Sequence, residues 1–195
     1  ILPSILLAIL STTSSSLTLP VIFIPTGKSL TINGNSHILK NITSVKFTSI
    51  SDDNSSEERR YYGAAGLIAT AYGNVTVTNI TLENINVKNT HTSNVGILIS
   101  ANTSDGSLAP KNLTITDVTI KNSTVIGNRN VGALVGNQDQ KSGNANSVFK
   151  VEGVVLENVN VKTVVGNSGI IYGNVHSTVK ERVDASISKI TINNC

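Results

Sequence analysis

The chain has 195 residues and a formal net charge of +3, and charged residues make up only 14% of it. This length indicates a single domain, and the sparse charge excludes a basic surface of the kind that binds nucleic acid. Val, Ile and Thr together provide 64 residues, and Asn and Gly provide 39. β-Branched side chains favour strands while Asn and Gly favour tight turns, so an all-helical fold is excluded and many short strands are expected.

The first 28 residues form an apolar N-terminal segment. Residues 1–10 are almost all apolar, and residues 11–16 are small and polar. This order is typical of an export signal, and the apolar run is too short to cross a bilayer as a helix. Two interpretations stay open: a retained signal remnant, or an apolar cap on the fold that follows. Neither includes a transmembrane span.

A repeat occupies residues 29–195. Its pattern is apolar-x-apolar-x-x-apolar-x-apolar-x-Asn, and the closing Asn residues are 38, 36 and 36 residues apart. The four copies close at Asn84, Asn122, Asn158 and Asn194. A second element, Gly followed by two or three apolar residues, alternates with it at Gly66, Gly96, Gly132 and Gly169. The repeats therefore lie near 66–90, 96–126, 132–165 and 169–195.

Each copy predicts strands, because its apolar residues alternate with period two. The extra residue in the middle of the pattern changes the phase, which a strand accommodates only where the chain turns a corner. We expect an all-β parallel β-helix, that is, a β-solenoid with three short strands per turn and about 36 residues per repeat. Two inward rows are expected to stack, namely Ile80, Val118, Val154 and Ile190, and Leu82, Ile120, Leu156 and Ile192.

The closing Asn residues have two interpretations. Asn84, Asn122, Asn158 and Asn194 form either a side-chain ladder from turn to turn or a set of residues in left-handed turns. A ladder is favoured, because equivalent positions of a solenoid lie one above the next.

Two segments resemble a known family. Residues 29–38 resemble the opening turn of pectin-lyase-like parallel β-helix surface proteins, with Asn33 in place of the usual Asp. Residues 130–136 resemble the GLUG repeat of bacterial adhesins and protist surface proteins. The resemblance implies a right-handed solenoid that acts as a scaffold or stalk, extracellular or at the cell surface.

The resemblance also raises the alternative of a carbohydrate-active lyase or hydrolase. The family's hydrolases carry Asn-Thr-Asp, Gly-His-Gly and Arg-Ile-Lys signatures, and none of these occurs in the sequence. The adjacent acids Asp52 and Asp53 lie in a charged loop, and His37, His91 and His176 lie among turn residues. We therefore assign no catalytic, cofactor-binding or metal-binding residue, and expect a non-enzymatic protein without a cofactor.

Partners are expected at two places. Insertions at 101–112, 137–147 and 174–184 fall at the same point of successive repeats, and aligned loops of this kind commonly bind a glycan or protein ligand. The last repeat closes next to Cys195 without a capping segment, so we expect this end to be covered by another chain, by a continuation of this chain, or by a second copy stacked head to tail, with Cys195 buried. Head-to-tail covering would make the protein a self-assembling filament subunit.

Seven Asn-x-Ser/Thr sequons are candidate N-glycosylation sites in a secreted chain. They are Asn41, Asn54, Asn74, Asn79, Asn102, Asn112 and Asn122. Asn54 and Asn102 are expected to be the most exposed of them.

Overall fold

The structure is a computed structural model that describes residues 22–45, 64–90, 94–103, 111–140, 147–177 and 184–195. Within these ranges the chain is all-β, and every strand pairing is parallel. In the same ranges no helix has the length and apolar character needed to span a membrane. The predictions of an all-β fold and of parallel pairing are confirmed.

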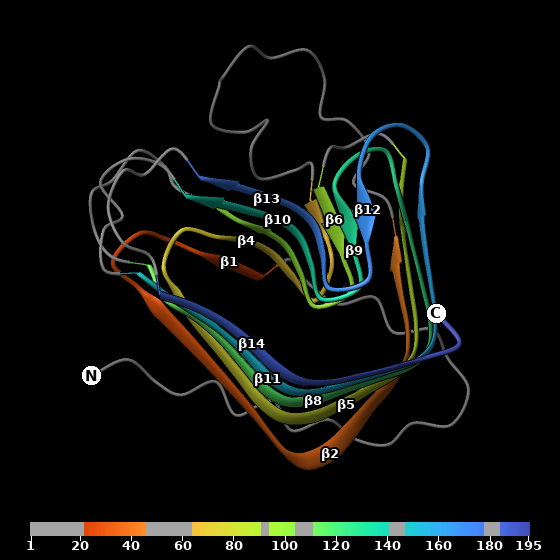
Figure 1. Cartoon of the computed structure of the whole chain (residues 1–195), viewed down its shortest axis with the longest axis horizontal. Helices are drawn as coiled ribbons and strands as arrows, with labels where there is room; N and C mark the ends of the chain where they lie inside the picture. The colour runs from red at the N-terminus through yellow and green to blue at the C-terminus, as the bar shows by residue number, and fades with distance from the viewer. Residues whose placement is uncertain (1–21, 46–63, 91–93, 104–110, 141–146, 178–183) are drawn as a thin grey trace.

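The strands form three sheets. The long sheet contains, in spatial order, β2 (Ser29–Val45), β5 (Asn74–Asn89), β8 (Leu113–Gly127), β11 (Val148–Thr163) and β14 (Asp184–Asn193). The second sheet contains β1 (Ile22–Ile24), β4 (Ile68–Ala71), β7 (Ile99–Asn102), β10 (Val135–Gln140) and β13 (Tyr172–Ser177). The third sheet contains β3 (Ala64–Ala65), β6 (Asn94–Gly96), β9 (Val131–Gly132) and β12 (Ser168–Gly169). From β3 onward, each pass of the chain adds one strand to the third, the second and the long sheet in that order (Figure 1).

The strands of the long sheet are not short. β5 has 16 residues and bends at Asn79 and Asn84, which have φ values of 52° and 54°. The next strand, β8, bends in the same way at Asp117 and Asn122. The sequence pattern predicted separate short strands on either side of the first bend, and this part of the prediction is wrong. Pairing continues on both sides of each bend because the neighbouring strand bends at the equivalent residue.

The Gly-apolar segments, in contrast, divide into two strands. A Cβ atom at Gly96 would lie 2.1 Å from the carbonyl oxygen of Ile99, and one at Gly132 would lie 2.1 Å from that of Val135. Only glycine fits so tight a turn. The chain therefore turns sharply between the third and second sheets, and the outline of one pass is indented rather than triangular (Figure 1).

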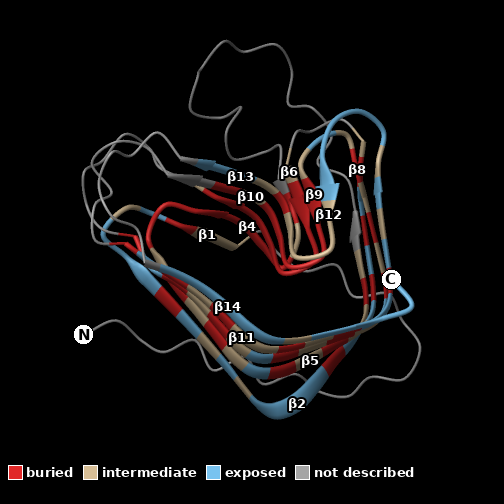
Figure 2. Ribbon diagram, in the orientation of Figure 1, coloured by how far each residue is buried: buried red, intermediate tan, exposed pale blue. Residues whose placement is uncertain are grey.

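The core lies between the long sheet and the two shorter ones. Leu82 pairs with Ile120, and Ile120 with Leu156, and all three side chains are at most 1% exposed. The predicted inward rows are confirmed, with one difference at the end of the stack. Ile192 pairs with Leu156 but is 46% exposed, because no described strand lies beyond β14. Figure 2 shows the same trend, with buried residues in the middle passes and exposed ones on β12 to β14.

Candidate functional site

The closing Asn residues stack at the second bend of the long strands. Nδ2 of Asn84 donates to Oδ1 of Asn41 at 2.8 Å, and Nδ2 of Asn158 donates to Oδ1 of Asn122 at 3.0 Å. Nδ2 of Asn194 in turn donates to Oδ1 of Asn158 at 3.3 Å. All five residues have φ between 50° and 60°. The row thus combines the two interpretations of the sequence, since each Asn occupies a left-handed turn and also takes part in a side-chain hydrogen bond.

Asn41 was missed as the first member of this row. Two extra residues lie between Asn33 and His37 relative to β5, and they shift the pattern that ends at Asn41. The sequence feature that could have identified Asn41 is the apolar-x-Asn ending Leu39-x-Asn41, which every later copy shares.

Asn side chains also link passes at other corners. Nδ2 of Asn130 donates to Oδ1 of Asn94 at 2.9 Å, and Nδ2 of Asn174 donates to Oδ1 of Asn137 at 2.8 Å. These pairs are 36 and 37 residues apart, which is the length of one repeat. The spacing would have identified them, because polar residues one repeat apart lie on neighbouring passes.

Most of the sequon residues lie at these corners. Asn79, Asn112 and Asn122 are exposed, Asn41 and Asn74 are half-buried, and Asn54 is outside the described residues. Asn102 is completely buried, and its Nδ2 donates to Oε1 of Gln138 at 2.8 Å. The expectation that Asn102 is exposed is wrong, because this residue is the last of β7 and is covered inside the stack. Glycosylation of the sequons stays a prediction.

The predicted ligand-binding loops lie largely outside the described residues. At their described ends, Lys111 and Ser147 are buried, and the backbone N–H of Lys111 donates to Oγ of Ser147 at 2.9 Å. Asn102 and Gln138, which pair in the second sheet, are a second buried polar pair. All four residues fall within the insertions 101–112 and 137–147, which the sequence pattern assigns to loops. The signal for their pairing was again the spacing, since each pair is 36 residues apart.

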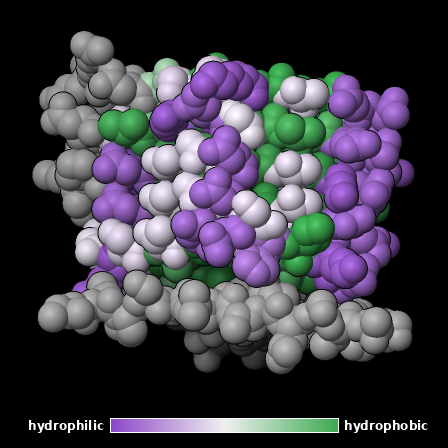
Figure 3. Space-filling model, turned by 90° about the horizontal axis from the view of Figure 1, so that it is seen from below, coloured by the Kyte–Doolittle hydropathy of each residue, from purple (hydrophilic) through white to green (hydrophobic). Residues whose placement is uncertain are grey.

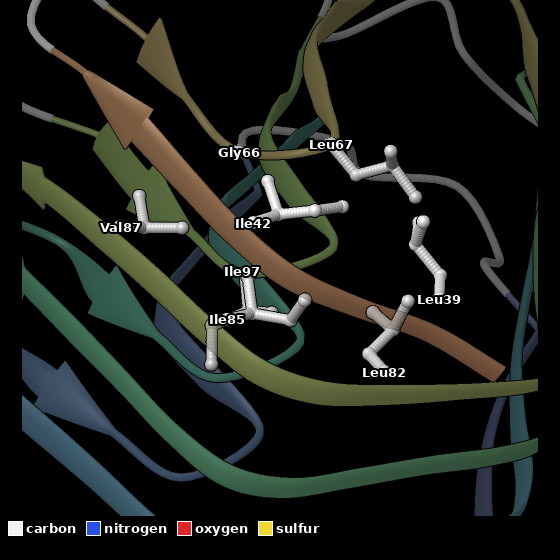
Figure 4. A pocket seen from close by; sticks show the side chains of 8 residues that line it. All are labelled: Leu39, Ile42, Gly66, Leu67, Leu82, Ile85, Val87 and Ile97. Atoms are coloured by element: carbon white, nitrogen blue, oxygen red, sulfur yellow. The ribbon is translucent and has the colours of Figure 1, made fainter. Parts of the chain in front are cut away.

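An apolar pocket lies near the first passes of the stack (Figure 4). It holds about 340 Å³ of space not filled by atoms, including the part open to solvent. It is lined by Leu39, Ile42, Gly66, Leu67, Leu82, Ile85, Val87 and Ile97. In the described residues the third sheet has no strand before β3, whereas the long sheet begins with β2. The lining has no polar side chain that would orient a polar ligand.

Charged side chains lie on the outer face of the long sheet. The carboxylate of Glu152 is 2.7 Å from Nζ of Lys150 and 2.6 Å from Nζ of Lys189. The hydrogen bond from Lys150, followed by that from Lys189, lowers the pKa of Glu152 to about 2. A carboxyl group with this pKa is ionised at neutral pH and does not suit a general acid. In Figure 3, which views this side of the molecule, strips of hydrophilic and of less polar side chains alternate.

The other acids and histidines do not converge. Glu83 pairs with Lys121 at 3.6 Å, and Asp117 lies at a bend. Nδ1 of His37 is 2.9 Å from the carbonyl oxygen of Gly34, and His176 is exposed. Across the described part of the chain, no three His, Cys, Asp or Glu residues lie where they could hold a metal ion. Asp52, Asp53 and His91 fall outside the described residues.

The last pass leaves an apolar end face. We define it as the exposed side chains of Val164, Val165, Val175, Ile187 and Ile192. They account for five of the seven large hydrophobic side chains that are exposed in the described ranges. Cys195, at the position filled by Val159 one repeat earlier, is also exposed in the single chain. The burial of Cys195 stays a prediction, because it depends on what covers this end.

Comparison of the chain with protein-family models, with curated proteins and with solved structures finds no significant match. The features that bear on its function are therefore those of the stack itself: the Asn corners, the buried polar pairs and the apolar end face.

Proposed function

We propose that this chain is a right-handed β-solenoid that serves as a non-enzymatic scaffold, extracellular or at a cell surface. The observation that carries the proposal is the register of the passes. From β3 onward each pass adds one strand to each of the three sheets, and equivalent residues, inside and at the corners, lie one above the next.

The corner hydrogen bonds support a role as a rigid spacer. Backbone pairing holds neighbouring passes together along every sheet, and the Asn pairs add side-chain bonds in the same direction. The stability of such a stack is approximately a sum of contributions from neighbouring passes. An elongated stack of this kind suits a spacer that extends over a distance or presents a large surface. The surface location is supported by the order of residues 1–16 and by the sequons.

The test of the solenoid is removal of one whole pass. Deleting residues 123–158 removes 36 residues and joins Asn122 to Val159, which pairs with Ser123 in the intact chain. This variant is expected to stay folded and to melt cooperatively at a lower temperature, because the remaining passes keep their register. The control deletes only 123–140, half a pass, and is expected to unfold. Unfolding of both variants would contradict the solenoid.

The test of the non-enzymatic role is an assay on polygalacturonate and related glycans. No turnover is expected. Measurable turnover that is abolished by substituting both Asp52 and Asp53 with Asn would contradict it. Antibody labelling of intact, unpermeabilised source cells tests the surface location.

A further inference from the structure

The first bend of β2 contains the one Asn–Gly pair of the sequence, Asn33–Gly34. Asn33 is exposed, and the pairing of β2 with β5 stops at this residue and resumes at His37. Gly34 therefore lies in a stretch without a register partner on β5. The two residues that follow, Asn35 and Ser36, have φ values of 48° and 61°. Bulges and left-handed residues of this kind often accompany a site of local chemistry.

The packing of β2 on β5 explains why residue 34 is a glycine. A Cβ atom at Gly34 would lie 2.5 Å from the backbone oxygen of Asn79 and 2.5 Å from Cβ of Ile80. Only glycine allows the two strands to approach so closely. The same lack of a side chain leaves the backbone nitrogen of Gly34 open to reaction with the side chain of Asn33, which directly precedes it.

Two hydrogen-bond donors contact the side-chain oxygen of Asn33. The backbone N–H of Asn35 donates to Oδ1 at 3.0 Å, and Nδ2 of Asn79 donates to the same atom at 3.4 Å. When a nucleophile adds to Cγ of an amide, negative charge develops on this oxygen, and donors that are already in place lower the barrier to the addition. The two donors are therefore positioned to stabilise the tetrahedral intermediate of an attack on Asn33.

We propose that Asn33 is a site of spontaneous covalent modification, at which the chain itself forms a succinimide. The backbone nitrogen of Gly34 adds to Cγ of Asn33, the bond from Cγ to Nδ2 breaks, and Nδ2 leaves as ammonia with the proton that Gly34 loses. Water then opens the ring at either carbonyl, which yields aspartate or isoaspartate at position 33. The reaction needs no reactant other than water, and it does not depend on the proposed function.

The reaction is expected to be selective for Asn33. In the Asn row, the attacking nitrogen would belong to a residue whose side chain crowds it, namely Ile42, Ile85, Ser123, Val159 or Cys195. The two products differ in their effect on the fold. An aspartate at position 33 keeps an acceptor for both donors, whereas an isoaspartate adds a methylene group to the backbone and is expected to disturb the pairing of β2 with β5.

The first test is incubation of the folded 195-residue chain at mildly alkaline pH, followed by peptide mapping with mass spectrometry and enzymatic detection of isoaspartate. Asn33 is expected to convert faster than every other Asn of the described ranges, with both products present. Asn33→Gln is the control and is expected to stay unmodified over the same period, because a glutamine has to close a less favourable six-membered ring. Circular dichroism of each sample checks that the chain is folded.

A second variant isolates the contribution of the donors. Asn79→Gly removes one donor and keeps a residue that accepts the φ of 52°. It is expected to slow the conversion of Asn33 at least about twofold in the folded chain, and to have no effect in urea, where the donor is no longer held in place. The matched control is Asn84→Gly, because Asn84 is also left-handed and on β5, but its Nδ2 donates to Asn41. This control is expected to leave the rate at Asn33 unchanged.

Three outcomes would overturn the proposal. If Asn33 converts no faster than the other Asn residues, the bulge protects it rather than exposing it to attack. An unchanged or higher rate in Asn79→Gly would mean that the amide of Asn79 does not stabilise the intermediate. Equal slowing by Asn84→Gly would assign the effect to the general pairing of β2 with β5 instead of to a donor at Asn33.

Discussion

Two matched substitutions, Ile120→Ala and Ile192→Ala, test the inward row of Leu82, Ile120, Leu156 and Ile192. Both residues are isoleucines at the same position of the repeat, but Ile120 is fully buried and Ile192 is 46% exposed. Replacing a buried Ile by Ala costs about 2–5 kcal/mol of unfolding free energy, from lost burial and from the cavity that remains.

For Ile120 the upper part of that range applies, about 4 kcal/mol, because the paired strands on both sides hold the backbone and keep the cavity from closing. For Ile192, half of the side chain is already in water and no closed cavity forms, so about 1 kcal/mol is expected. The expected difference of about 3 kcal/mol is large compared with the total stability of about 5–15 kcal/mol for a natural domain.

The assay is urea unfolding, with the midpoint and the slope of the transition compared between variants. The stronger variant, Ile120→Asp, puts a charge into the dry core and is expected to abolish folding, whereas Ile192→Asp is expected to fold. Equal losses for the two alanine variants, or a soluble Ile120→Asp variant that melts cooperatively, would refute the inward register.

Three further predictions follow from single residues. The pKa of Glu152 is lowered from 4.5 to about 2, so the stability that its ionised form contributes is present above pH 4.5 and is lost as the pH falls through 2. The urea midpoint of the native chain should therefore fall more steeply on acidification than that of Glu152→Gln. Asn158 donates one corner hydrogen bond and accepts another in a left-handed turn, so Asn158→Gly should cost about 1–2 kcal/mol from the lost bonds, and Asn158→Ala about 1 kcal/mol more from the backbone strain, as measured by urea unfolding. Gly96→Ala should destabilise by roughly 3 kcal/mol or more in thermal melts, because the new Cβ would lie 2.1 Å from a backbone oxygen that cannot move aside.

Each of these has a result that would contradict it. If the urea midpoints of the native chain and of Glu152→Gln fall equally on acidification, the ion pairs of Glu152 do not contribute to stability. Equal stability of Asn158→Gly and the native chain would leave the Asn row with a conformational role alone. A Gly96→Ala variant that melts like the native chain would mean that the turn between the third and second sheets is looser than described.

The period and the inward face of this protein were determined by the sequence itself. The alternation in each copy identified Ile80, Val118 and Val154 as one buried row, because period-two spacing with a single phase change permits one inward set. The spacing of the closing Asn residues likewise predicted that they lie on neighbouring passes. Both are local properties that recur in every copy, and this recurrence allows them to be recognised from the sequence.

The tertiary structure decided the properties that depend on what lies beside a residue. Asn102 and Lys111 have the composition of loop residues, yet both are buried, and each bonds to a residue of the next pass. The two ends of the stack also differ, since the extra residues before His37 make β2 irregular while β14 keeps a regular edge. A repeating pattern specifies how one pass packs on the next, but not where packing stops, because that depends on which surfaces the folded chain leaves uncovered.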